Sequence, residues 1–117
     1  MSVAAYDLSA SELPSTVSSQ ILATTKHMQL TTMSVDWEIP AEVHQVDQFT
    51  YIIEGMAKVE VRDKEDGDIK SYLLGPSQSI IITAGTTHRI INKSTSGPLK
   101  LFSVYSPMEH PVFHSIF

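Results

Sequence analysis

The sequence contains no cysteine, which excludes disulfide bonds, thiolate catalysis and thiolate metal ligands, and makes the cytoplasm the expected location. Cations are few: eight Lys and Arg stand against thirteen Asp and Glu, a net charge of −5. Because nucleic-acid binding depends on clustered cations, we expect no nucleic-acid partner. No run of residues is long and apolar enough to span a bilayer, so no membrane partner is expected. The N-terminus lacks a basic region, which predicts that the chain is not exported.

What the sequence does contain is typical of one folded all-β domain. Apolar residues make up 42% of the 117 positions and charged residues 18%. Short apolar runs are separated by turn residues, a pattern that favours a β-sandwich or barrel. We predict a single domain over residues 1–117. Its core lies at about 19–106, with an N-terminal arm at 1–18 and a C-terminal tail at 107–117.

The apolar runs predict eight strands, at residues 19–24, 27–35, 48–54, 56–63, 69–74, 79–83, 88–93 and 99–105. The segment through Trp37 and Pro40 is predicted to be irregular, and residues 9–14 can form one helical turn. The consecutive residues Ile80, Ile81 and Ile82 predict a strand that is buried on both faces.

Four polar residues are the best indication of function. His44 lies two positions after Glu42 and Gln48 four positions after His44, so on extended backbone the three side chains point to the same side. His88 comes 44 positions after His44, from another strand. Two imidazoles, a carboxylate and an amide oxygen are a plausible ligand set for a divalent transition metal: Fe, Mn, Ni, Co or Zn.

Each of these residues has a simpler interpretation. A lone histidine on an apolar strand is usually a core residue with one hydrogen bond. Glu42 can be a solvated loop carboxylate after Pro40. Gln48 can orient His44 or bond the backbone instead of contacting metal. The tail residues His110 and His114 can approach the site, although solvent or inter-subunit contacts explain them as well.

Two stretches resemble the motifs that define the cupin superfamily, which are Gly-x5-His-x-His-x3,4-Glu-x6-Gly and Gly-x5-Pro-x-Gly-x2-His-x3-Asn. In this sequence they are matched by Glu42-x-His44-x3-Gln48-x6-Gly55 and by Ser77-x5-Thr83-x-Gly85-x2-His88-x3-Asn92. The spacing is kept throughout. The ending LKLFSVYSPMEHPVFH is similar to the C-terminus of small stand-alone bacterial cupins that are labelled mannose-6-phosphate isomerase-like.

The resemblance implies a single-domain jelly-roll, or double-stranded β-helix barrel, with metal bound inside. The sequence departs from the family at two ligand positions, where Glu42 replaces the first histidine and Gln48 replaces the glutamate. Ser77 replaces a glycine and Thr83 a proline, two changes that affect the turn before His88. Gly75-Pro76 can supply that turn instead.

The ligand set and the fold leave three functions open. The first is a metal-dependent isomerase, lyase or dioxygenase that acts on a small polar metabolite, with Glu42 as a candidate base. The second is a non-catalytic module that binds metal or a small molecule, such as a sugar. The third is a cupin that only dimerises. A homodimer is expected in each case, because pairing covers open sheet edges.

Overall fold

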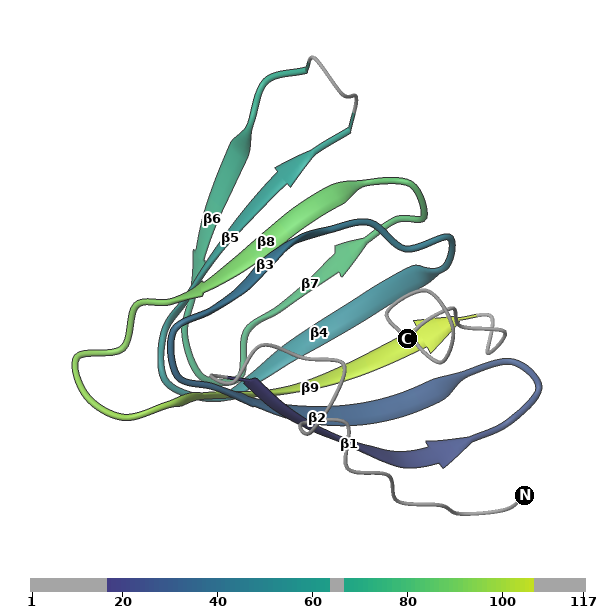
Figure 1. Cartoon of the computed structure of the whole chain (residues 1–117), viewed down its shortest axis with the longest axis horizontal. Helices are drawn as coiled ribbons and strands as arrows, with labels where there is room; N and C mark the ends of the chain where they lie inside the picture. The colour runs from purple at the N-terminus through teal and green to yellow at the C-terminus, as the bar shows by residue number, and fades with distance from the viewer. Residues whose placement is uncertain (1–16, 64–66, 107–117) are drawn as a thin grey trace.

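A computed structural model describes residues 17–63 and 67–106. The strands in this part are β1 (Val17–Thr24), β2 (Gln29–Val35), β3 (Glu38–Glu42), β4 (Asp47–Glu54), β5 (Ala57–Arg62), β6 (Lys70–Leu74), β7 (Ser79–Ile82), β8 (Thr87–Asn92) and β9 (Leu99–Ser106). They form a five-stranded sheet, β1-β2-β9-β4-β7, and a four-stranded sheet, β3-β8-β5-β6. All pairings are antiparallel. The two sheets face one another (Figure 1), which confirms the predicted jelly-roll class.

All eight predicted strands are present, and their ends are shifted by at most two residues. The predicted strand at 27–35 starts at Gln29 because the preceding residues form a tight turn. In this turn, the Thr25 amide donates to the Met28 carbonyl oxygen at 2.8 Å. The predicted helical turn at 9–14 and the tail lie outside the described residues. Within the described ranges, we find no helix with the length and apolar character needed to cross a bilayer.

The prediction of an irregular segment through Trp37 and Pro40 is wrong, because strand β3 spans Glu38–Glu42. β3 is the edge strand of the four-stranded sheet and pairs only with β8. A proline is tolerated in an edge strand, since its missing N–H can face away from the neighbouring strand. The register shifts between Ile39 and Glu42, and this irregularity brings Glu42 opposite His88.

The prediction that the three consecutive isoleucines are buried on both faces is also wrong. Ile82 is 2% exposed, whereas Ile81 is 68% exposed. β7 is the edge strand of the five-stranded sheet, and only its inner face meets the opposite sheet. Here the unbroken apolar run indicates a β-strand, but the opposite sheet covers only one face of that strand.

The interior is apolar at one end and polar at the other. The apolar core contains ten fully buried residues: Val17, Val35, Ile39, Ile52, Ala57, Val59, Ile82, Ile90, Leu99 and Leu101. Along β9, the inward-facing positions change from Leu99 and Leu101 to Ser103 and Tyr105. The polar end of the sandwich therefore begins where the hydrophobic core stops, and it holds the residues predicted to bind metal.

Ser77 lies in a strained turn that precedes β7. The Gln78 amide donates to the Gly75 carbonyl oxygen at 3.1 Å, which closes a four-residue turn with Pro76 at its second position. Ser77 is third, with a φ of 68°, and this geometry corresponds to a type II turn. Gly75-Pro76 thus provides the turn before β7. The prediction that it supplies the turn before His88 is wrong, because residues 83–86 form that turn. The strain falls on the serine that replaces the family's glycine.

Replacing Ser77 with glycine is expected to stabilise the protein by about 0.5–1 kcal/mol. A left-handed backbone costs an L-residue roughly 1–2 kcal/mol, and glycine's greater freedom in the unfolded chain offsets about 0.5–1 kcal/mol of the gain. Urea unfolding measures the difference. The control is Ser79→Gly, two residues later in extended backbone, which should destabilise the fold. Destabilisation by both substitutions would contradict the assigned strain.

Candidate metal centre

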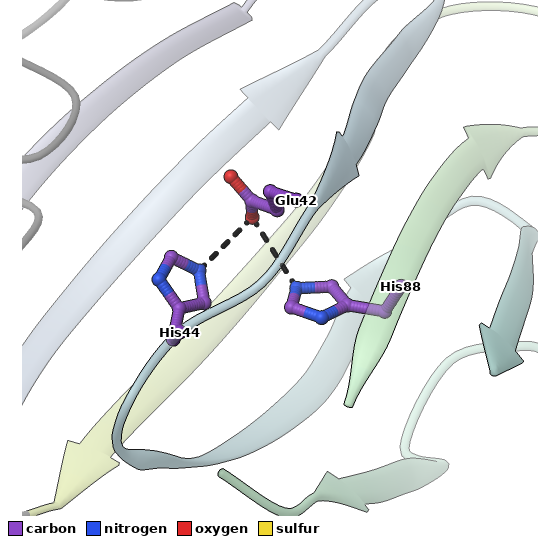
Figure 2. A group of neighbouring side chains, drawn as sticks. All are labelled: Glu42, His44 and His88. Atoms are coloured by element: carbon purple, nitrogen blue, oxygen red, sulfur yellow. Dashed lines mark hydrogen bonds and ion pairs between the residues drawn. The ribbon is translucent and has the colours of Figure 1, made fainter. Parts of the chain in front are cut away.

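Glu42 is the central residue of the site. It ends β3 and faces His88 of β8 across the pair of strands. Its Oε1 lies 3.1 Å from Nε2 of His44 and 3.3 Å from Nε2 of His88. Figure 2 shows the two imidazoles on either side of this carboxylate oxygen. One ligand atom from each of the three residues lies within 4.8 Å of the others, so the three donors converge on one point.

His88 is held in the tautomer that a metal ligand needs. Its side chain is buried, and Nδ1 lies 3.1 Å from the Thr86 carbonyl oxygen, to which it donates its proton. Nε2 is then the ring atom that faces Glu42 and can bind a metal. Apart from the 3.3 Å contact with Glu42 Oε1, this nitrogen has no polar partner among the described residues. A metal ion bound to both atoms can span this distance.

His44 lies in the loop that crosses from β3, in one sheet, to β4, in the other. Its carbonyl oxygen accepts a hydrogen bond of 2.9 Å from the Gly85 amide. Three residues later, at the start of β4, Asp47 Oδ1 accepts the Ala84 amide at 2.9 Å. The loop that carries His44 is therefore fastened to the turn that precedes His88. These bonds explain how two distant parts of the sequence meet.

Gly85 makes this attachment feasible. It has a φ of +84° in the turn that the Thr86 amide closes on the Thr83 carbonyl oxygen. A positive φ at this position suits glycine. The glycine of the second motif is thus retained where the backbone requires it, while Thr83 occupies the proline position without breaking the turn.

Glu42, His44 and Gln48 do not lie on one strand, contrary to the simple two-residue periodicity. Glu42 ends β3, His44 belongs to the connecting loop, and Gln48 lies on β4 in the other sheet. Gln48 is buried, and its Nε2 donates to Thr50 Oγ1 at 2.8 Å rather than to His44. Its Oε1 has no partner among the described residues. Direct ligation by Gln48 stays a prediction.

The electrostatics of the centre favour an ionised carboxylate. Burial by itself raises the pKa of Glu42, but hydrogen bonds and charge from His44 and His88 outweigh burial and lower the pKa to about 2. Tyr105 is fully buried, and its ring meets His44 edge-on with centroids 5.4 Å apart. Burial, and then the charge of Glu42, raises the pKa of Tyr105, so its phenol stays protonated.

Two charged residues next to motif positions make contacts outside the centre. Asp47 is exposed and bonds the backbone, and Arg89 points to the outer face, where it pairs with Glu38 at 2.8 Å. His27 lies in the turn before β2 and not on a strand. His110 and His114 lie outside the described residues.

A set of buried polar residues beside the centre was not predicted from the sequence: Gln29, Thr31, Thr50, Ser103 and Tyr105. The sequence pattern indicates their burial only weakly. In β2 and β9 these residues occupy the same alternate positions as apolar core residues, but only the paired register shows that they are neighbours.

Comparison with known proteins identifies the family. The family model described as the Cupin domain matches residues 29–105, more than half of the chain. This chain is a cupin. It is 38% identical over 93 residues to the uncharacterized protein YrkC of Bacillus subtilis (strain 168), an alignment covering 77% of this cupin and 50% of YrkC. The cupin spans about half the length of the relatives that it matches by sequence.

Solved structures agree with this fold. BH2720 from Bacillus halodurans is 34% identical, with a TM-score of 0.69, and the match covers 74% of this cupin and 67% of BH2720. Hydroxypropylphosphonic acid epoxidase from S. wedmorenis is 22% identical with a TM-score of 0.65, covering 77% of this cupin and 50% of the epoxidase, and shows the fold alone. Membership of the mannose-6-phosphate isomerase-like subgroup stays a prediction.

Proposed function

We propose that this cupin binds a divalent transition metal through Glu42, His44 and His88. The observation that carries the proposal is the convergence of their three donor atoms within 4.8 Å. Two imidazoles and one carboxylate suit Fe, Mn, Co, Ni or Zn. HppE, whose solved structure has the same fold, is known in an iron(II) form.

We propose further that the metal serves isomerase, lyase or oxygenase chemistry on a small polar metabolite. A bound divalent metal would act as a Lewis acid toward a carbonyl or hydroxyl oxygen, or would support dioxygen chemistry. Glu42 is better suited to hold the cation than to act as a base, because a carboxylate with a pKa of about 2 accepts protons poorly at neutral pH.

One observation supports the alternative, a non-catalytic binding module. Apart from Tyr105 and the two histidines of the centre, no residue of the buried set described for residues 17–63 and 67–106 carries a group that titrates. A second acid or base is therefore missing from this part of the interior, although proton-transfer catalysis commonly uses one.

The location and the assembly complete the proposal. We infer a homodimer in the cytoplasm, from the absence of cysteine and from the open sheet edges. The exposed apolar side chains on the outer face of β4 and β7 also support pairing, since Ile53 is 47% and Ile81 is 68% exposed.

Elemental analysis tests the metal site. Untagged protein purified without chelator and incubated with each metal in turn should retain about one equivalent after desalting. Retention of less than about 0.1 equivalent of every metal would refute the site. Turnover assays with sugars, keto acids and aromatic diols, run on loaded and metal-free protein, then separate an enzyme from a binding module.

A further inference from the structure

A short pattern occurs twice on the inner face of the five-stranded sheet. Gln29 and Thr31 on β2 and Gln48 and Thr50 on β4 each form a Gln-x-Thr unit. In both units the glutamine Nε2 donates to the threonine Oγ1, at 3.2 Å on β2 and 2.8 Å on β4. All four side chains are at most 3% exposed. The repeated geometry indicates that the two units have the same role.

Strand β9 runs between the two units and joins them. Tyr105 pairs in register with Gln29 on one side and with Gln48 on the other. One step along, Ser103 pairs with Thr31 and Thr50, and its hydroxyl lies 2.8 Å from Thr50 Oγ1. Because neighbouring strands lie about 4.8 Å apart, the backbones of the two glutamines are roughly 10 Å apart.

Each glutamine still has one polar atom without a partner. Oε1 of Gln29 and Oε1 of Gln48 have no hydrogen bond among the described residues. Turning either amide over does not help, because a threonine hydroxyl can donate or accept and the other amide atom is then left over. An unpaired buried polar group costs about 1–3 kcal/mol. Two such groups at matched positions point to a ligand that provides the missing bonds.

Together the two Gln-x-Thr units, Ser103 and Tyr105 form a polar row on the inner face of the sheet. We propose that this polar row binds an uncharged, polyhydroxylated small molecule, such as a sugar or a cyclitol. Hydroxyl groups both donate and accept, so they satisfy either amide atom. No Lys or Arg of the described residues is buried, and Arg89 is engaged with Glu38 and Glu60 on the outer face. A buried carboxylate or phosphate on this row would lack a counter-ion.

The inference deepens the proposed function and rests on it for one point, that the bound molecule is presented to the metal. Tyr105 makes this connection, because it belongs to the row and its ring contacts His44. Binding to the row itself needs no metal, so it can be tested in metal-free protein. This test also removes the attraction of a metal for anionic ligands.

The experiment is an NMR titration of metal-free protein, following the side-chain amide signals of Gln29 and Gln48. The probes are D-glucose, D-xylose and myo-inositol, and the charged counterparts are D-glucuronate and glucose 6-phosphate. We expect at least one neutral probe to shift both amides and to bind at least about tenfold more tightly than the anions. If no neutral probe binds, so that water alone satisfies the amides, the inference is overturned. Equal binding of the anions would overturn it too.

Gln29→Met removes one amide at nearly constant volume. Gln20→Met on the exposed side of β1 is the matched control. Affinity for the best neutral probe should fall at least about tenfold in the first variant and stay unchanged in the second. Thr31→Val tests the same unit if Gln29→Met does not fold, and unchanged affinity in the variant that folds refutes the assignment. Metal retention should be normal in all of them, so a failed metal site and a failed polar row give different results.

Discussion

Replacing Glu42 with alanine is expected to abolish the rise in melting temperature that a divalent transition metal gives to the wild-type protein. A metal that binds only the folded state stabilises it, and the shift grows with metal concentration. Glu42 is the only anion of the triad and contacts both imidazoles. Its loss leaves two neutral ligands, and the affinity should fall at least about 100-fold, beyond the usual effect of losing a supporting residue.

His88→Ala should abolish the shift equally, whereas Gln48→Ala should only weaken it. His27→Ala is the matched control, because this exposed histidine lies in the turn before β2 and is not one of the three converging residues. A thermal-shift titration and equilibrium dialysis against one metal give both quantities. Loss of binding in His27→Ala, or equal losses at Gln48 and Glu42, would contradict the assigned ligand set.

Asn92→Ala is expected to produce a large loss of stability for a half-buried residue, about 2–4 kcal/mol. Its Nδ2 lies 3.0–3.1 Å from the carbonyl oxygens of Val35, Asp36 and Gly97, which share its two N–H protons, and its Oδ1 accepts the Ser94 amide at 2.8 Å. Each intramolecular bond contributes about 1 kcal/mol, and the carbonyls left unpaired add to the cost. Urea unfolding measures the change.

Asn92→Asp distinguishes hydrogen bonding from volume. Aspartate has nearly the same shape but cannot donate, and its charge faces three carbonyl oxygens, so it should destabilise at least as much as alanine. Lys93→Ala, at the exposed neighbouring position, should change the stability by no more than about 0.5 kcal/mol. An Asn92→Asp variant as stable as wild type would refute the role of the donated bonds.

Much of the architecture was predictable from local pattern. Alternation of residues such as Val59 and Lys58 is sufficient to identify a strand and its buried face, and in the structure Val59 is buried whereas Lys58 is partly exposed. β3 could not be predicted in this way, because Pro40 interrupts the pattern and the strand depends on pairing with β8. The exposure of Ile81 likewise depends on which strand ends the sheet, a property of topology rather than of the segment.

The candidate site was predictable to the extent that spacing determines it. The separation of Glu42 and His44, with His88 in a second motif, was sufficient to expect a common centre, and the three side chains do converge. The polar row was not predicted, because Gln29 and Tyr105 are 76 positions apart and become neighbours only through the pairing of β2 with β9. The sequence pattern predicts which face of the sheet a side chain lies on, but not which residues of other strands are its neighbours.

The position of β9 between β2 and β4 has a consequence for how this protein reaches its native state. The central strand of the larger sheet is the last described one in the chain, so neither neighbour completes its hydrogen bonding until that segment arrives. Pairings between such distant segments make folding slow. Glu42 and His88 meet through a similar long-range pairing. Binding of the proposed metal by all three residues would therefore follow folding, and the metal would stabilise the native state rather than nucleate its formation.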